Sequence, residues 1–211
     1  MQTPIPLGFY LARRHVSCSM WPQVTYRGVD RLLHLPSPDE VDHWRSTGKR
    51  ELADLWDRYD EAQENGTLNV DYVLADRLLL DFQSHQFEVE LIYVELSVIP
   101  KGLEEYPHGV LWAEELERAL AYIQKVGRPL KERPQEAHSL GYDLAHPIRS
   151  FHSAIFQPGL HKTCPLLPQM LNKYGLFFDL ATAMTVLDQA NALDYGGLPF
   201  CILEVFSMGE D

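Results

Sequence analysis

The residues best suited to chemistry by type and spacing are Asp143, His146 and His152, within the stretch from Gly141 to Ile155. Neutral imidazoles and a carboxylate can together bind zinc. The same groups can transfer protons during hydrolysis if a pocket brings them together. The trio therefore defines one functional hypothesis, a small hydrolase or a metal-dependent enzyme.

The trio depends on two predicted strands, 141–146 and about 150–156, with a turn at Pro147 between them. The strand register decides which side chains share a face, so His146 and His152 need not face the same side. Ser153 follows His152 directly, and neighbouring strand residues point to opposite faces, so His152 is poorly placed to activate this serine. The geometry favours a structural role for the stretch, without a catalytic residue.

Sequence motifs for known chemistries are missing from this chain. Phosphate loops of the GxxxxGK[ST] or GxGxxG type are absent, as are HExxH, GxSxG and CxxC. Cys201 lies in an apolar run and is expected in the core, whereas Cys164 is expected to be exposed but without an activating group. We expect a protein that is not an enzyme and that uses neither a metal nor another cofactor.

Composition narrows the class of partner. The 211 residues carry a formal net charge of −12, which disfavours binding to nucleic acid because phosphate attracts cations. No window approaches the roughly 18 apolar residues that cross a bilayer, and the N-terminus lacks the pattern of a secretory signal. The three cysteines are scattered, which suits a reducing compartment. A cytoplasmic protein that does not bind membranes is expected.

The order of the predicted elements indicates an α/β (α+β) fold, with a mixed or mainly antiparallel sheet covered by helices. Residues 1–211 are expected to form one domain, with a candidate sub-boundary at 127–139. Further strands are expected at 7–11, 23–26, 87–99 and 198–206. The run at 87–99 is the best candidate for a central strand, because its continuous apolar part indicates burial on both faces or a bulge.

Helices are predicted from capping residues and apolar spacing. The first begins after Ser37, is interrupted near Gly48 and ends at the Asn65-Gly66 turn. Asn69 is expected to cap the second and Asp179 to cap the last. Two others are expected at 112–126 and about 166–173.

Acidic residues concentrate in the helical part of the chain. Residues 39–81 hold twelve acids against five bases, and residues 85–120 hold eight against two. Such runs are often only the solvated face of a helix. The alternative is a surface that attracts a basic partner and repels wrong ones.

A family resemblance covers residues 141–207. It rests on Gly141-Tyr142-Asp143, the His152-Ser153 step, the run 171–177, a helix with Ala181 and Ala183, and a closing strand at 199–205. This part of the chain resembles immunity proteins of bacterial toxin systems of the polymorphic, contact-dependent or type VI kinds. The resemblance implies that these pieces are sheet strands and a crossover helix rather than catalytic elements.

The resemblance also implies a function in interbacterial competition. The protein would bind a cognate protein toxin, for which a basic nuclease is a candidate, and would neutralise it by stoichiometric occlusion. The partner surface predicted from the acidic runs comprises Asp57, Asp60, Glu61 and Glu64, with Glu104 and Glu105 as second choice. A regulatory or scaffold domain without a toxin is a third reading, and the oligomeric state stays open.

Overall fold

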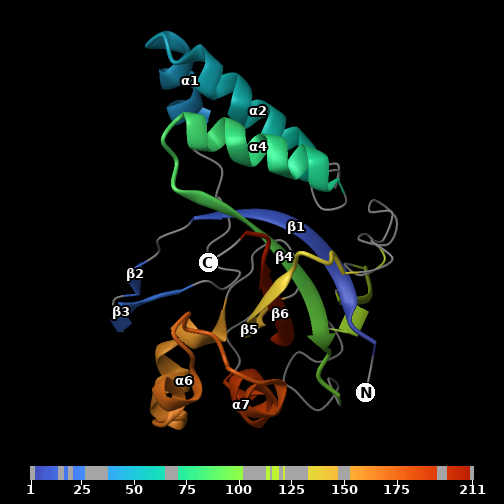
Figure 1. The fold of residues 1–211 in the computed structure, drawn as a ribbon. Coiled ribbons are helices and arrows are strands. Elements are labelled where there is room, and N and C mark those ends of the chain that lie inside the picture. Colours follow the sequence, from blue (N-terminus) through green and yellow to red (C-terminus); the bar gives the residue numbers. More distant parts are fainter. Residues whose placement is uncertain are drawn as a thin grey trace.

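The computed structural model describes residues 3–13, 17–18, 21–26, 38–64, 71–101, 113–114, 116–118, 121, 133–146, 153–193 and 199–209. At its centre is a four-stranded antiparallel sheet in the order β1-β4-β6-β5 (Figure 1). The strands are β1 (Ile5–Arg13), β4 (Val89–Val98), β6 (Cys201–Ser207) and β5 (His138–Ala145). A separate pair is formed by β2 (Ser17–Cys18) and β3 (Trp21–Thr25). The predicted α+β class is confirmed.

Helices cover both faces of the sheet (Figure 1). On one side lie α1 (Pro38–Ser46), α2 (Arg50–Glu64) and α4 (Tyr72–Ser84). On the other side lie α6 (Pro158–Thr163) and α7 (Leu180–Ala192), with the 3-10 turns η3 (Ala154–Phe156) and η4 (Leu167–Met170) nearby in sequence. The chain therefore forms three layers. Within the described ranges, no helix is both long and apolar enough to cross a bilayer.

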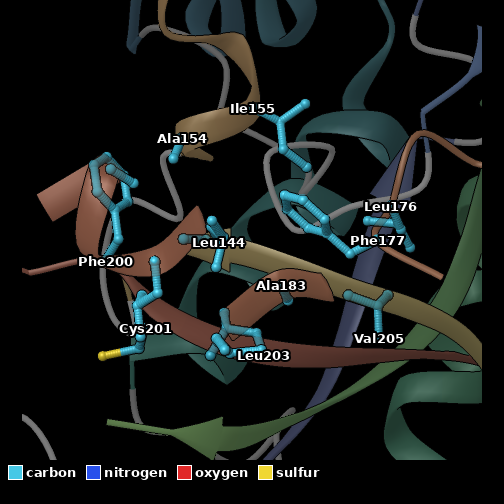
Figure 2. Packing of buried hydrophobic residues seen from close by; sticks show 14 of the residues in the cluster. Leu144, Ala154, Ile155, Leu176, Phe177, Ala183, Phe200, Cys201, Leu203 and Val205 are labelled. Atoms are coloured by element: carbon cyan, nitrogen blue, oxygen red, sulfur yellow. The ribbon is translucent and has the colours of Figure 1, made fainter. Parts of the chain in front are cut away.

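Strand register divides the apolar residues into two cores. Phe9 of β1 is opposite Tyr93 of β4, and both belong to the core under α1, α2 and α4. The next pair, Tyr10 and Ile92, points to the other face and joins the second core. Figure 2 shows part of this second core, to which β5, β6, α7 and the loop residues Leu176 and Phe177 contribute. The alternation follows directly from the two-residue period of a strand.

The predicted central strand is confirmed. β4 pairs with β1 on one side and with β6 on the other. Seven consecutive residues from Leu91 to Ser97 are buried, because both faces of this strand are covered. The register to β6 also shifts between Leu96 and Val98, so the apolar run reflects two-sided burial together with an irregularity.

Helix ends agree with the sequence in two places and differ in one. Gly48 adopts φ +83° between α1 and α2, which explains the predicted interruption. Asp179 caps α7 by accepting a hydrogen bond from the Thr182 amide, at 2.7 Å. The predicted cap at Asn69 is wrong, because Asp71 accepts from the Leu74 amide at 3.0 Å and α4 begins at Tyr72. Asn69 itself lies outside the described residues, as does most of the predicted helix 112–126.

The predicted strand at about 150–156 is wrong over its described part. Ser153 makes one isolated bridge to Ala145, and the 3-10 turn η3 follows at once. The cause is local, since the Ser153 hydroxyl accepts a hydrogen bond from the Ile155 amide and so starts the turn. The helix α6 then begins at Pro158, where no helix was predicted from the sequence.

A tight turn at 172–177 extends the sheet beside β5. The Asn172 side chain donates to the Leu140 carbonyl at 2.7 Å, and its oxygen accepts from the Tyr174 and Leu176 amides. Phe177 then exchanges two backbone hydrogen bonds with Tyr142, each 2.9 Å long. The run 171–177, which carries part of the family resemblance, is thus a structural element that holds the outer edge of β5.

We predict that Gly141→Ala destabilises the protein by about 2–4 kcal/mol. Gly141 has φ +132°, and an added Cβ would lie 2.6 Å from the Phe177 carbonyl oxygen and 2.8 Å from the Asn172 amide nitrogen. Thermal or chemical denaturation measures the change. Gly48→Ala is the control, because Gly48 also has a positive φ, of +83°, but has open space around it, so this substitution is expected to cost less stability. Equal costs for the two variants would contradict the steric explanation.

Candidate functional site

Asp143, the carboxylate of the predicted trio, is completely buried in β5. It accepts hydrogen bonds from the Tyr26 hydroxyl and from the Ser153 hydroxyl, the latter at 2.6 Å. Ser153 is only 1% exposed and Tyr26 is fully buried, with its ring edge-on to Phe156. A buried carboxylate that receives two hydroxyl donors ties β5 to the two segments that supply them. These contacts favour a structural role for Asp143.

Two histidines of this region, His146 and His161, lie within the described residues, and each has a described contact. His146 is buried and its ring packs on Phe200, with 4.5 Å between the centroids. His161 contacts the Ile155 carbonyl at 2.8 Å. His152 lies outside the described residues. In the part of the chain that the structure describes, no three His, Cys, Asp or Glu side chains come together as a metal-binding group.

Cys164 and Cys201 are both buried. Cys201 is in β6 within the second core, and its burial raises the pKa of the thiol, which disfavours the reactive thiolate. Cys164 is 7% exposed, so its predicted exposure is wrong. It closes α6 as the C-cap residue and packs with the same core. Both cysteine side chains therefore pack in the core as small apolar groups.

A second polar cluster was not predicted from the sequence. Glu95 of β4 and Glu204 of β6 are directly opposite each other in the register, and they are only 4% and 9% exposed. Like charges in this position repel. Arg133 compensates them, with nitrogen–oxygen distances to Glu95 of 2.5 and 3.2 Å and to Glu204 of 3.5 Å. Its guanidinium also lies 4.0 Å above the Phe206 ring.

Hydroxyl groups complete the Glu95–Glu204–Arg133 cluster. The Tyr93 hydroxyl donates to Glu95 at 3.2 Å, and the Ser139 hydroxyl donates to Glu204 at 2.8 Å. Burial raises the pKa of Tyr93, and the charge of Glu95 raises it further. Burial and Glu204 likewise raise the pKa of Tyr142, the register neighbour of Glu204. Both phenols therefore stay protonated and serve as donors, which completes a satisfied network.

A weak sequence signal for this cluster existed. Glu95 and Glu204 each have apolar residues on both sides in the sequence, which is unusual for a charged residue. Their pairing depends on the register of strands far apart in sequence. Arg133 lies in the candidate sub-boundary 127–139, whose described part begins at residue 133 and continues into β5.

Comparison of the chain with protein-family models, with curated proteins and with solved structures gives no match. The choice of a site therefore rests on the geometry of this chain. The Asp143 cluster is enclosed in the core, and the Glu95–Glu204 pair is closed by Arg133. Among the described residues, the remaining concentration of acidic side chains lies on α1, α2 and α4.

The acidic face of α2 consists of the exposed carboxylates Glu51, Asp54, Asp57 and Glu61. They recur every three or four residues, which places them along one side of the helix. Asp57 pairs with Arg45 of α1 at 2.7 Å, and Arg45 also binds Asp42. The hydrogen bond to Asp57 is the main cause that raises the pKa of Arg45. Glu51, Asp54 and Glu61 have no ion pair among the described residues.

The predicted partner residues are therefore not equivalent. Glu61 is exposed, Asp57 is exposed but paired, and Asp60 is only half-exposed. The backbone of Glu64 ends α2, while Glu104 and Glu105 lie outside the described residues. Two exposed acids that the prediction omitted, Glu51 and Asp54, belong to the same face. The i, i+3 and i+4 spacing from Glu61 already contained this signal.

Proposed function

We propose that this protein is an immunity protein, which binds a basic cognate toxin and occludes it stoichiometrically through the acidic face of α2. One observation carries the proposal: Glu51, Asp54 and Glu61 are exposed on one side of the helix and have no ion pair among the described residues. The resemblance of residues 141–207 to immunity proteins supports the same reading. No catalytic step is part of the proposal.

The physical argument is electrostatic. Asp54 and Glu61 are two turns apart, about 10 Å along the helix axis, so they form a short row of negative charge on one side of α2. Exposed charges act over about 8 Å at physiological salt, so they guide an approaching partner more than they hold it. A nuclease cleft that accepts polyphosphate would accept such a row of carboxylates.

The double reversal Asp54→Lys/Glu61→Lys is expected to slow association with the toxin by about tenfold or more at low salt. The partner to test is the toxin domain of any large secreted protein that is encoded beside the gene for this chain. Stopped-flow or surface-based kinetics at several salt concentrations measure the rate. In the unchanged protein the association rate should fall as salt rises, and in the variant this dependence should be weaker.

Glu114→Lys/Glu117→Lys is the matched control, because it makes the same change in net charge at two other exposed positions. If both double variants slow association equally, overall charge rather than the α2 face is responsible. An association rate that does not respond to salt, or the absence of any toxin gene beside this one, would count against the proposal.

A further inference from the structure

The outer side of α4 carries an apolar strip. Six large apolar side chains are exposed among the described residues, and three of them, Tyr72, Val73 and Leu80, belong to this one helix. Val73 is 66% exposed and Leu80 58% exposed. They are seven residues apart and so lie on the same side of the helix, about 10 Å from each other. Single exposed apolar residues are ordinary, but two on the same side of one helix can serve as a contact with another molecule.

The apolar strip adjoins the acidic face of α2. Arg58 of α2 binds Asp81 of α4 across the seam between the helices, at 3.0 Å, and both side chains are exposed. Arg58 lies between Asp54 and Glu61 along α2, while Asp81 directly follows Leu80. The two helices therefore present one continuous surface. The exposed acids of this surface lie on α2 and its exposed apolar residues on α4, where the exposed Arg77 stands between Val73 and Leu80 in sequence.

We infer that the apolar strip is the docking site for an apolar anchor on the same basic partner, and this inference rests on the proposed function. The occupant it commits to is a cationic amphipathic helix of that partner, whose apolar side chains lie beside its cations. The charge of the adjoining α2 face selects this chemistry over an acidic or neutral partner. Charges around a contact mainly set the rate of association, whereas buried apolar anchors slow dissociation.

Two synthetic helical peptides test the inference without the toxin. Both carry the same lysines, and one has leucines at i, i+3 and i+4 spacing where the other has serines. Fluorescence anisotropy measures their binding at low salt. The leucine peptide is expected to bind about tenfold more tightly than the serine peptide. Val73→Ser/Leu80→Ser should remove most of this preference, while Asp54→Lys/Glu61→Lys should weaken both peptides.

Leu166→Ser/Met184→Ser is the matched control, because it removes two other exposed apolar side chains and should leave the preference unchanged. Melting curves should show that all variants remain folded. Equal binding of the two peptides, or an unchanged preference in Val73→Ser/Leu80→Ser, would overturn the inference. So would a dimer in sedimentation that this variant converts to a monomer, since the occupant would then be a second copy. If only the acid reversal has no effect, the electrostatic proposal fails while the apolar site stands.

Discussion

Replacing Arg133 by Met is expected to lower the free energy of unfolding by about 2–4 kcal/mol, because it leaves two buried carboxylates side by side without a cation. The range is below that of a fully buried pair, since the Arg133 side chain is 41% exposed. Methionine retains much of the apolar contact with the Phe206 ring, over which Arg133 lies. The loss of stability is therefore due mainly to the missing positive charge. Urea denaturation measures it.

A double-mutant cycle isolates the electrostatic part of this effect. Glu95→Gln in the Arg133→Met background removes the repulsion between the two carboxylates and should recover about 1–3 kcal/mol relative to simple addition of the single effects. Arg133→Lys keeps the charge but loses the bidentate contact with Glu95. It should therefore lower the free energy of unfolding, but by less than Arg133→Met does. Additive single and double variants would contradict the assigned role of Arg133.

Asp143→Ala is expected to destabilise the protein by about 2–5 kcal/mol, because it leaves two buried hydroxyl groups without their acceptor. These are the hydroxyls of Tyr26 and Ser153, which both donate to Asp143. The enzyme hypothesis assigns Asp143 a chemical role, and a catalytic carboxylate can often be replaced without loss of stability. Chemical denaturation of Asp143→Ala therefore separates the two roles.

Removing the two hydroxyl donors one at a time tests the structural role of Asp143 further. Ser153→Ala and Tyr26→Phe each remove one hydrogen bond to Asp143, and each should cost less than Asp143→Ala, about 1–3 kcal/mol. Ser153→Ala is expected to loosen η3 as well, because the same hydroxyl accepts from the Ile155 amide. A stable Asp143→Ala protein, with a free energy of unfolding near that of the unchanged chain, would refute the structural role.

Local patterns were sufficient for the main elements. The apolar run of β4 predicted a central strand because burial on both faces requires continuous apolar residues. Asp179 and Gly48 predicted the start of α7 and the break between α1 and α2, since capping and positive φ depend on neighbouring residues alone. Where two local signals competed, as for Asn69 and Asp71, the boundary moved by a short distance.

Local sequence patterns could not predict which side chains pair with each other. Ser153 was assigned to a strand because apolar neighbours surround it, whereas its hydroxyl starts a turn and joins Asp143 in the core. Asp57 was expected to be available to a partner, but Arg45 from the neighbouring helix occupies it. In both cases the partner comes from an element whose placement depends on the packing of the whole chain.

The sequence by itself determined the α+β class, the central place of β4 and the acidic character of the α1–α2–α4 region, because composition and periodicity are properties of single segments. Only the tertiary structure decided that Glu95 and Glu204 face each other under Arg133, and that Tyr26 and Ser153 donate hydrogen bonds to Asp143. The physical reason is strand register. A shift of one residue moves every side chain to the other face, and the contacts that select the register come from distant parts of the chain.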